Sequence, residues 1–397
     1  MNANMPETDQ TAPIDHSGQK DESVQKSQKS GSVHDGGGAH SGHHHSHHHH
    51  SRSHARKRRK MIAATVAVIL VVCLATGGLL AQNWQHQKNL GVTVSNSEES
   101  GDSGSSENTL TGSYREVVYN GETYTYNNLV TCILYAGIDS TGPLESAAVY
   151  GNKARADSIE LVVLDKYNQK LSVLAINRDT MTEIRLYSST GNDDGLYTSH
   201  LGYAYSWGDG GEVSCENLCE AVSLLLGGIP ILQYVVTNKD SMTWINDLVG
   251  GVTVTVPNSE LEEQYPELTE GAVVTLDETN VTAFLQYRDT SEDFTNEGRM
   301  DRQQAYITAY IQLLQQMDLD AFEDAWASME EMEDYLQTSV TKSQYLDLAE
   351  LVLSLDFSEG DYIQLAGEDE AGDLHDEFWV DEEALQETIL DLFYISD

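Results

Sequence analysis

Basic residues are scarce in this chain of 397 residues, where 22 Lys and Arg stand against 64 Asp and Glu and give a formal net charge of −42. The shortage is uneven, because residues 1–60 hold nine of the basic residues and only six acidic ones. Proteins that bind nucleic acids neutralise phosphates with Lys and Arg. Residues 82–397 therefore argue against a nucleic-acid partner and favour a soluble, self-repelling domain.

Cysteine is also rare. Of the four cysteines, Cys73 lies in a long apolar run and Cys132 in a predicted strand. Cys215 and Cys219 stand four positions apart on a predicted helix, where a disulfide within one turn would be strained. The absence of any CxxC pair excludes a zinc site of that spacing. We expect ordinary buried thiols.

Charge is missing altogether from residues 61–81, MIAATVAVILVVCLATGGLLA. As a helix this stretch would span about 31 Å, which matches a hydrocarbon core of about 30 Å. Six basic residues precede it in RSHARKRRK, and basic flanks stay in the cytoplasm. A cleaved signal peptide is the alternative, but the 60-residue lead is too long for one. We expect a single-pass anchor in the cell membrane, with the N-terminus cytoplasmic and residues 82 onward extracellular.

Composition divides the rest of the chain into segments. Residues 1–60 include the tract HHHSHHHH and predict a disordered, His-rich cytoplasmic tail, with weak binding of transition metals as the alternative. Residues 82–112 have the Ser, Gly and Glu content of a flexible linker. We expect the catalytic domain at 113–317 and an acidic, mostly helical extension packed on it at 318–397. Within that extension, residues 368–384 look too acidic to lie near an anionic ligand and should face solvent.

Strand and helix patterns alternate in the folded part. Residues 129–139, 158–165 and 171–176 are predicted strands, and the last two form a hairpin around KYNQK. A helix is predicted at 214–228, with Ser214 as its N-cap. Further strands are predicted at 233–238 and 251–257, and further helices at 239–251, 277–287, 297–317, 320–336, 343–355 and 381–394. The alternation predicts an α/β fold, a mixed central β-sheet covered by helices on both faces as an αβα sandwich.

Only seven Arg follow residue 81, and five of them stand at the ends of predicted elements: Arg155, Arg178, Arg288, Arg299 and Arg302. Arg presents a planar, permanently charged fork that suits phosphate oxygens. Arg299, Gln303 and Tyr306 share one helix face, with Arg302 beside them. This placement favours an anion site, although a simple carboxylate partner for each Arg remains the alternative.

Two carboxylates accompany these cations. Asp139 ends one predicted strand, and Asp157 directly precedes another. Mg²⁺ prefers one or two carboxylates together with phosphate oxygens. The pair is consistent with Mg²⁺ bridged to a diphosphate, and with the alternative that each Asp caps a strand end.

The order of four segments resembles the LytR–CpsA–Psr family of Gram-positive cell-envelope enzymes. The segments are AGID, RADSIELVVLDKYNQKLSVLAINRDT, NDLVGGVTVTVP and LDETNVTAFLQYRDTSEDFTNEGRMDRQQ. The resemblance covers about residues 130–310, and the expected anchor agrees with it. It implies a membrane-anchored phosphotransferase that moves a glycan (teichoic acid, capsular or another wall polysaccharide) from a polyprenyl-pyrophosphate lipid onto peptidoglycan.

The resemblance also implies roles for particular residues. Asp139 and Asp157 correspond to the Mg²⁺ carboxylates, and Asp179, beside Arg178, to the acid that helps activate the acceptor hydroxyl. The pyrophosphate binders would be Arg155, Arg178, Arg288, Arg299 and Gln303, and the helix spacing adds Arg302 to them.

Three positions depart from the family pattern. Asn177 stands where the family usually has Pro, which predicts a less rigid turn. Gln286 replaces one Arg of a paired R-x-R, and His200 stands where many members carry Lys. The two lost charges predict weaker binding or a different substrate.

Two other functions remain open from the sequence. The first is a hydrolase or pyrophosphatase of polyprenyl diphosphate lipids, in which water replaces the acceptor. The second is a non-catalytic, anchored attenuator or binding protein for envelope polymers.

Overall fold

A computed structural model describes residues 111–151, 153–288, 296–372 and 375–396. The expected tail at 1–60, the anchor at 61–81 and nearly all of the linker lie outside these residues. Within the part of the chain that the structure describes, no helix is both long and apolar enough to cross a membrane.

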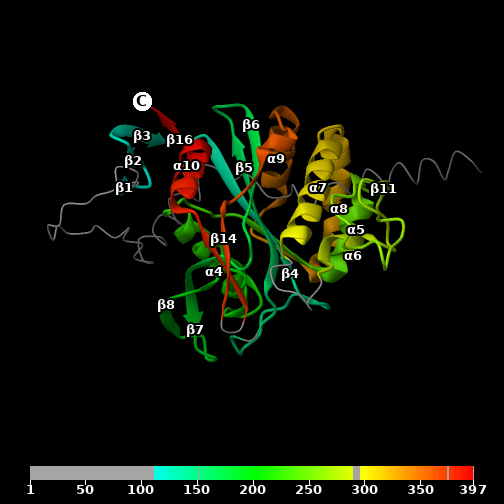
Figure 1. The fold of residues 1–397 in the computed structure, drawn as a ribbon, viewed down its shortest axis with the longest axis horizontal. Coiled ribbons are helices and arrows are strands. Elements are labelled where there is room, and N and C mark those ends of the chain that lie inside the picture. The colour runs from blue at the N-terminus through cyan, green and yellow to red at the C-terminus, as the bar shows by residue number, and fades with distance from the viewer. Residues whose placement is uncertain (1–110, 152, 289–295, 373–374, 397) are drawn as a thin grey trace, which may run out of the picture. The chain divides into compact units, whose positions relative to one another are not determined.

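A six-stranded mixed sheet lies at the centre of the fold (Figure 1). Its spatial order is β12-β9-β4-β5-β6-β13, formed by β4 (Val130–Ile138), β5 (Ala156–Asp165), β6 (Lys170–Ala175), β9 (Tyr234–Asn238), β12 (Leu336–Thr338) and β13 (Tyr362–Gln364). The β4–β5, β5–β6 and β9–β12 pairs are antiparallel, whereas β4–β9 and β6–β13 are parallel. The predictions of a mixed central sheet and of the β5–β6 hairpin are confirmed.

The hairpin turn after β5 shows how local sequence sets this geometry. The Asp165 carboxylate accepts hydrogen bonds from the backbone N–H groups of Tyr167 (2.7 Å) and Asn168 (3.1 Å). Gln169 then adopts a φ of 56°, which turns the chain back into β6. Aspartate is favoured in such turns because its side chain replaces a backbone acceptor.

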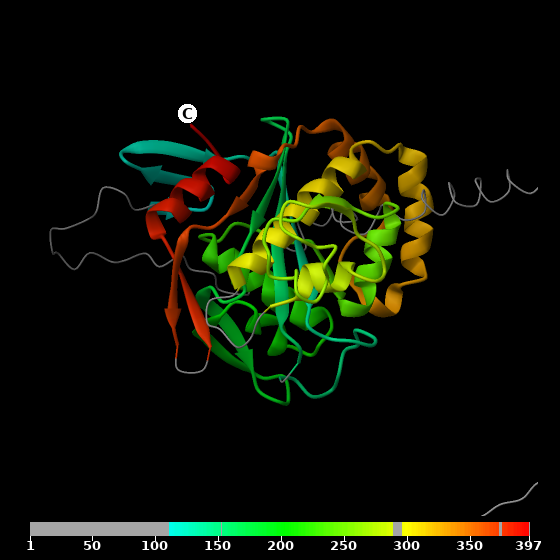
Figure 2. The same ribbon diagram turned by 45° about the vertical axis from the view of Figure 1, so that its right-hand side comes forward.

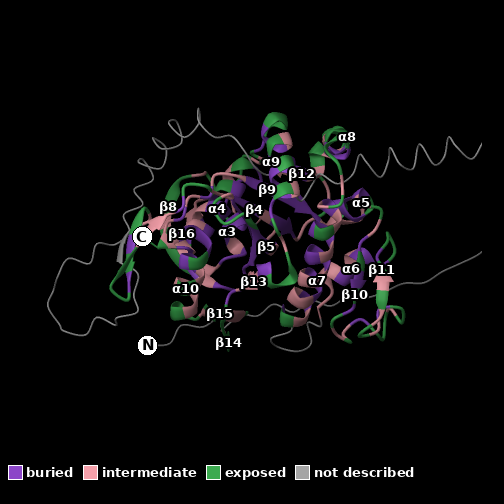
Figure 3. Cartoon of the chain, turned by 90° about the horizontal axis from the view of Figure 1, so that it is seen from above, coloured by how far each residue is buried: buried purple, intermediate pink, exposed green. Residues whose placement is uncertain are grey.

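Helices cover both faces of the sheet (Figure 2). Alternate residues of β5 enter two separate apolar clusters, because successive strand side chains point to opposite faces. One cluster contains side chains of α5 (Met242–Leu248), α6 (Val281–Gln286), α7 (Asn296–Leu314), α8 (Leu319–Glu330) and α9 (Lys342–Ser354). The other contains side chains of α3 (Tyr203–Ser206), α4 (Glu212–Leu225) and α10 (Glu382–Phe393). Figure 3 shows the buried residues gathered where strands and helices meet.

Short strands and turns complete the described fold. A second sheet has the order β1-β2-β3-β16, formed by β1 (Thr111–Ser113), β2 (Glu116–Tyr119), β3 (Glu122–Tyr126) and β16 (Tyr394–Ser396). Three antiparallel pairs are β7 (Met181–Tyr187) with β8 (Asp193–His200), β10 (Thr253–Thr255) with β11 (Val273–Thr275), and β14 (Gly367–Ala371) with β15 (Asp376–Val380). The 3₁₀ turns are η1 (Lys239–Ser241), η2 (Glu333–Tyr335) and η3 (Glu359–Asp361).

The start of α4 corrects one sequence prediction. Ser214 lies inside the helix and does not cap it, since α4 begins at Glu212. The Asp209 carboxylate accepts from the backbone N–H groups of Gly211 (2.7 Å) and Ser214 (3.3 Å), so it takes the role expected of Ser214. Cys215 and Cys219 on this helix are free and buried, as expected.

Residues after 317 are integral to the sheet. β12 and β13 form its two edges, while β14 and β15 lie between α9 and α10 in the chain and β16 follows α10, and these three strands belong to the smaller sheets. The helices predicted in this region are present, but the strands were not anticipated, because each is only three to five residues long.

Candidate active site

The candidate site lies at one end of the central sheet, where neighbouring strands begin or end. β4 ends before Asp139, and its antiparallel partner β5 begins beside Asp157. β9 runs parallel to β4 and ends before Lys239, whose Nζ forms an ion pair with the Asp139 carboxylate. Lys239 was missed from the sequence, although a cation directly after a strand was the signal that singled out the arginines.

A β-bulge sets the position of Asp157. In the β4–β5 register Ile138 pairs with Ala156 and Gly137 with Ser158, which leaves Asp157 as the additional residue. A bulge of this kind turns a side chain away from the regular alternation of the strand. The Asp157 carboxylate pairs through Oδ1 with Nη1 of Arg178, and its Oδ2 lies 3.6 Å from Nη1 of Arg299. One carboxylate is thus shared by two of the predicted arginines.

The turn that carries Arg178 and Asp179 is held by Asn177. The Asn177 side-chain oxygen accepts from the Asp179 backbone N–H (2.9 Å) and from the Asn296 amide (2.7 Å). The Asn296 oxygen in turn accepts from Nη2 of Arg299 (2.5 Å). Hydrogen bonds therefore constrain the turn where the family pattern has Pro, and they connect it to the first turn of α7.

Asp179 lies directly beside Arg178 in space as well as in sequence, with 3.4 Å between Nε of Arg178 and Oδ1 of Asp179. The loop at Gly202 packs tightly on this turn, because the Gly202 N–H donates to the Arg178 carbonyl (2.8 Å). A Cβ at this glycine would lie 2.6 Å from the Ala156 carbonyl oxygen and 3.3 Å from Cβ of Arg178. The close approach requires glycine at position 202.

Electrostatics differ between the two arginines that share Asp157. Burial, reinforced by the neighbouring charge of Arg178, lowers the pKa of Arg299 to about 10. Burial also lowers the pKa of Arg178, but the carboxylates of Asp157 and Asp179 outweigh it and leave a raised pKa. Both groups remain cationic at neutral pH, and the carboxylates stabilise Arg178 more than Arg299.

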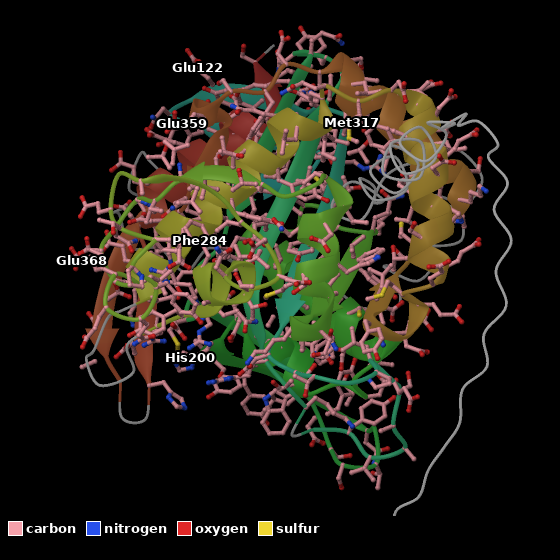
Figure 4. All side chains as sticks on the ribbon, turned by 90° about the vertical axis from the view of Figure 1, so that its right-hand side faces the viewer. Glu122, His200, Phe284, Met317, Glu359 and Glu368 are labelled. Atoms are coloured by element: carbon pink, nitrogen blue, oxygen red, sulfur yellow. The ribbon has the colours of Figure 1, made fainter. Side chains whose placement is uncertain are left out.

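Arg155 and Arg288 border the same end of the sheet through other partners. The Arg155 guanidinium lies 5.5 Å from the ring centroid of Tyr203, and its Nη1 is 3.4 Å from the Tyr203 hydroxyl oxygen. Arg288 pairs with Asp376 of β15, with 3.0 Å between Nη2 and Oδ2. In Figure 4 His200 lies at this edge, among nitrogen-bearing side chains.

The expectation that residues 368–384 face solvent is confirmed for residues 368–371 of β14, which are exposed, but Asp376 and Phe378 of β15 correct it. Besides the Arg288 pair, the Asp376 carbonyl accepts a hydrogen bond from Nε2 of His200 (2.9 Å). The Phe378 N–H donates to the Asp179 carbonyl (2.9 Å), which ties β15 to the Arg–Asp turn. The acidic strand β15 can lie near the candidate site because Arg288 pairs with the carboxylate of Asp376.

Arg302 has a different set of partners. Its side chain is completely buried and binds the carbonyls of Phe284 and Tyr287, together with Asn258 and Glu260. These contacts hold the end of α6 against the segment after β10. Arg302 is therefore a structural residue and not part of the candidate ligand site.

Gln303 donates to the Leu285 carbonyl (3.2 Å) from the same helix.

Glu160 on β5 is a buried carboxyl that the sequence did not single out. Its Oε1 accepts from the Ser158 hydroxyl (2.7 Å), while Oε2 has no hydrogen-bond partner among the described residues. Burial raises its pKa to about 7, although the Ser158 bond and the Arg299 charge lower it in part. A weakly acidic carboxyl thus lies close enough to Arg299 to be affected by its charge.

The donor set is compatible with Mg²⁺. No three His, Cys, Asp or Glu side chains gather as a metal-binding group within the described ranges. Mg²⁺ needs fewer protein ligands when phosphate oxygens complete its shell. Asp139 and Asp157 come from adjacent strand ends, and their carboxylates are partly exposed, at 32% and 19%. These two residues fit the protein's share of such a site.

Together, four cations at this end of the sheet suit an anionic ligand of more than one charge, with Arg299 buried behind the others at 4% exposed. Arg155, Arg178, Arg288 and Arg299 come from four separate segments and border one end of the sheet. The alternative from the sequence was that each Arg simply pairs with a carboxylate. Three of the four arginines do have such a partner, namely Arg178, Arg288 and Arg299. Asp179 adds an oxygen acceptor beside Arg178, so the site can bind an anion and accept a proton close to it.

Comparison with known proteins gives a match to a sequence model of the LytR_cpsA_psr family over residues 91–392. The polyisoprenyl-teichoic acid–peptidoglycan teichoic acid transferase TagV of Bacillus subtilis is 27% identical over 246 residues, 60% of this chain and 56% of that protein. TagU of Halalkalibacterium halodurans, with the same transferase name, is 29% identical over 45% of this chain and 51% of its own length. The chain spans about half the length of the curated relatives that it matches.

Solved structures show the same fold. The crystal structure of B. subtilis TagV matches with a TM-score of 0.50 at 22% identity, over 66% of this chain and 96% of that one. TagT bound to LIIa-WTA matches with a TM-score of 0.50 at 19% identity, over 67% and 90%.

Proposed function

The chain belongs to the LytR_cpsA_psr family, and on that premise we propose that it is a membrane-anchored transferase. It would move a glycopolymer, such as a teichoic acid, from a polyprenyl-diphosphate lipid to peptidoglycan. The names of the two relatives described above, both teichoic acid–peptidoglycan teichoic acid transferases, support this choice of reaction. The observation that carries the proposal is the sharing of Asp157 by Arg178 and Arg299, directly beside Asp179.

The cations would hold the diphosphate and stabilise the charge that develops on it. Arg178 and Arg299 would contact the phosphate oxygens nearest to Asp179, and Arg155 and Arg288 would contact those further along the ligand. Guanidinium groups fixed by carboxylates are preorganised for this task, because they need little reorientation when the charge moves. Asp139 and Asp157 would hold Mg²⁺, which supplies further positive charge to the diphosphate oxygens when bound.

Asp179 would accept the proton of the acceptor hydroxyl. The hydroxyl oxygen then forms a bond to the phosphorus on the glycan side, and the bond between that phosphorus and the bridging oxygen breaks. Polyprenyl phosphate leaves with the bridging oxygen, and the glycan becomes joined to peptidoglycan through a phosphodiester. The backbone contact from Phe378 to Asp179 (2.9 Å) keeps this residue beside Arg178.

The expected anchor at 61–81 agrees with this substrate. Each CH₂ group of a polyprenyl tail adds about 0.8 kcal/mol to its retention in the bilayer, so the headgroup must be processed at the membrane surface. We propose a single-pass protein of the cell membrane, with the described domain outside the cell.

The test is a product assay with the full-length protein in detergent. A glycan-bearing polyprenyl-diphosphate lipid is supplied with Mg²⁺ or EDTA, with or without peptidoglycan, and release of polyprenyl monophosphate is measured. We expect release that needs both metal and acceptor and that is lost in Arg178→Ala but not in Arg115→Ala, an exposed control. Release without any acceptor would indicate a hydrolase. Tight lipid binding with no release would indicate a binding protein.

A further inference from the structure

Three rings meet beside the proposed diphosphate site. His200 ends β8, Tyr203 begins α3 and His375 directly precedes β15. The ring centroids of His200 and Tyr203 are 5.5 Å apart, those of His200 and His375 are 6.2 Å apart, and those of Tyr203 and His375 are 6.3 Å apart. We call these three residues the ring cluster. His375 comes from a distant part of the chain, so only the fold brings it to His200 and Tyr203.

The ring cluster borders charged groups of the proposed site on two sides. Arg155 lies against the Tyr203 ring, at 5.5 Å from its centroid. The Asp376 carbonyl accepts from Nε2 of His200, and the Asp376 carboxylate pairs with Arg288. A ligand that bridges Arg155 and Arg288 would therefore pass beside the rings.

The cluster remains accessible. His375 is exposed, and His200 and Tyr203 are only partly buried. Its edges also offer hydrogen-bonding groups, because the Tyr203 hydroxyl and the Asp376 carboxylate adjoin the rings. Since Nε2 of His200 donates its N–H to the Asp376 carbonyl, Nδ1 is the ring nitrogen that a ligand can bond.

We propose that the ring cluster is a subsite for one pyranose ring next to the diphosphate. A pyranose presents apolar C–H groups on its faces and hydroxyls around its edge. The C–H groups pack favourably on the negative faces of aromatic rings, and the hydroxyls can bond to the oxygen and nitrogen atoms at the cluster's edge. Because the cluster adjoins two of the phosphate-binding arginines, this inference rests on the proposed function.

The pyranose could belong to either substrate. The sugar attached to the diphosphate lies on the donor, and the sugar that carries the attacking hydroxyl lies on the acceptor. Both share the chemistry that the rings recognise, so the two sources are separated by experiment.

His375→Ala is the main variant, since an exposed residue can be removed with little risk to folding, and His375→Phe keeps a ring at the same position. Tyr197→Ala, an exposed ring elsewhere on β8, serves as the matched control. With the full-length protein, one measures the Kd of inorganic pyrophosphate, the Kd of a polyprenyl-diphosphate hexosamine, and the KM of a peptidoglycan glycan fragment.

For His375→Ala we expect a pyrophosphate Kd within about twofold of wild type, together with about tenfold weaker use of one sugar-bearing substrate, a loss of about 1.4 kcal/mol. Loss confined to the hexosamine lipid would assign the subsite to the donor, and loss confined to the glycan fragment would assign it to the acceptor. His375→Phe should retain most of the affinity.

Two results would overturn the inference. Equal losses for pyrophosphate and for the sugar ligands would mean that the rings only support the arginines. Unchanged values for every ligand would mean that no sugar contacts the cluster. Failure of the wild type itself to bind any diphosphate would instead reject the proposed function, and the subsite with it.

Discussion

The Arg178 guanidinium pairs with the Asp157 carboxylate across 21 positions of sequence, and both side chains are mostly buried, at 12% and 19% exposed. The pair connects the bulge at the start of β5 to the turn after β6. A partly buried guanidinium held in this way keeps one orientation, which is the property that a phosphate-binding group needs.

Asp157→Asn tests this relationship. The variant leaves Arg178 and Arg299 close together with no shared anion, so we expect a stability loss of about 1–2 kcal/mol, less than for a fully buried pair. Lipid turnover should fall by at least tenfold. Urea unfolding and the release assay measure the two effects. Asp193→Asn removes a carboxylate from the more exposed pair with Arg185 and should leave turnover intact; equal behaviour of the two variants would contradict the prediction.

Arg302→Leu separates a structural arginine from the ligand-binding ones. Its removal leaves Glu260 and the carbonyls of Phe284 and Tyr287 without their buried partner. We expect a loss of about 3–5 kcal/mol in the free energy of unfolding. The Kd of pyrophosphate, measured on the fraction that remains folded, should stay within about threefold of wild type. If the variant kept full stability but bound pyrophosphate much more weakly, Arg302 would belong to the ligand site.

Glu160→Gln tests the buried carboxyl through pH. The folded-state pKa of about 7 lies above the ordinary carboxyl value of 4.5, so the contribution of Glu160 to stability is complete below pH 4.5 and is lost as pH rises through 7. The shift corresponds to about 3 kcal/mol. Relative to wild type, Glu160→Gln should therefore gain stability between pH 5 and pH 8 in urea unfolding. Glu183→Gln, on an exposed position of β7, should show no such trend.

Asn177→Ala tests the turn that replaces the family's proline. The variant removes the acceptor for the Asp179 N–H and for Asn296. Leaving buried donors without partners costs about 1–3 kcal/mol, and turnover should fall with it because Arg178 and Asp179 lose their fixed geometry. Asn168→Ala, in the β5–β6 turn, should lower stability without a comparable loss of turnover per folded molecule. Unchanged kcat in Asn177→Ala would show that the turn is held by its other contacts.

Local patterns were sufficient for much of the fold. Runs of β-branched and apolar residues identified β4, β5, β6 and β9, and the polar residues that interrupt them located Asp139, Asp157 and Arg178 at strand ends. Helix ends were less well placed where a side chain from the preceding loop caps the helix, as Asp209 does for α4.

The sequence by itself determined which residues could meet at a strand end, because strand length and polarity are set by neighbours along the chain. Tertiary structure alone decided which of them do. It brought Asp376 to Arg288 across 88 positions, placed Lys239 on Asp139, and engaged Arg302 in buried contacts away from Asp157. These contacts depend on strand order and on a bulge, and both follow from how distant segments pack, which no local pattern records.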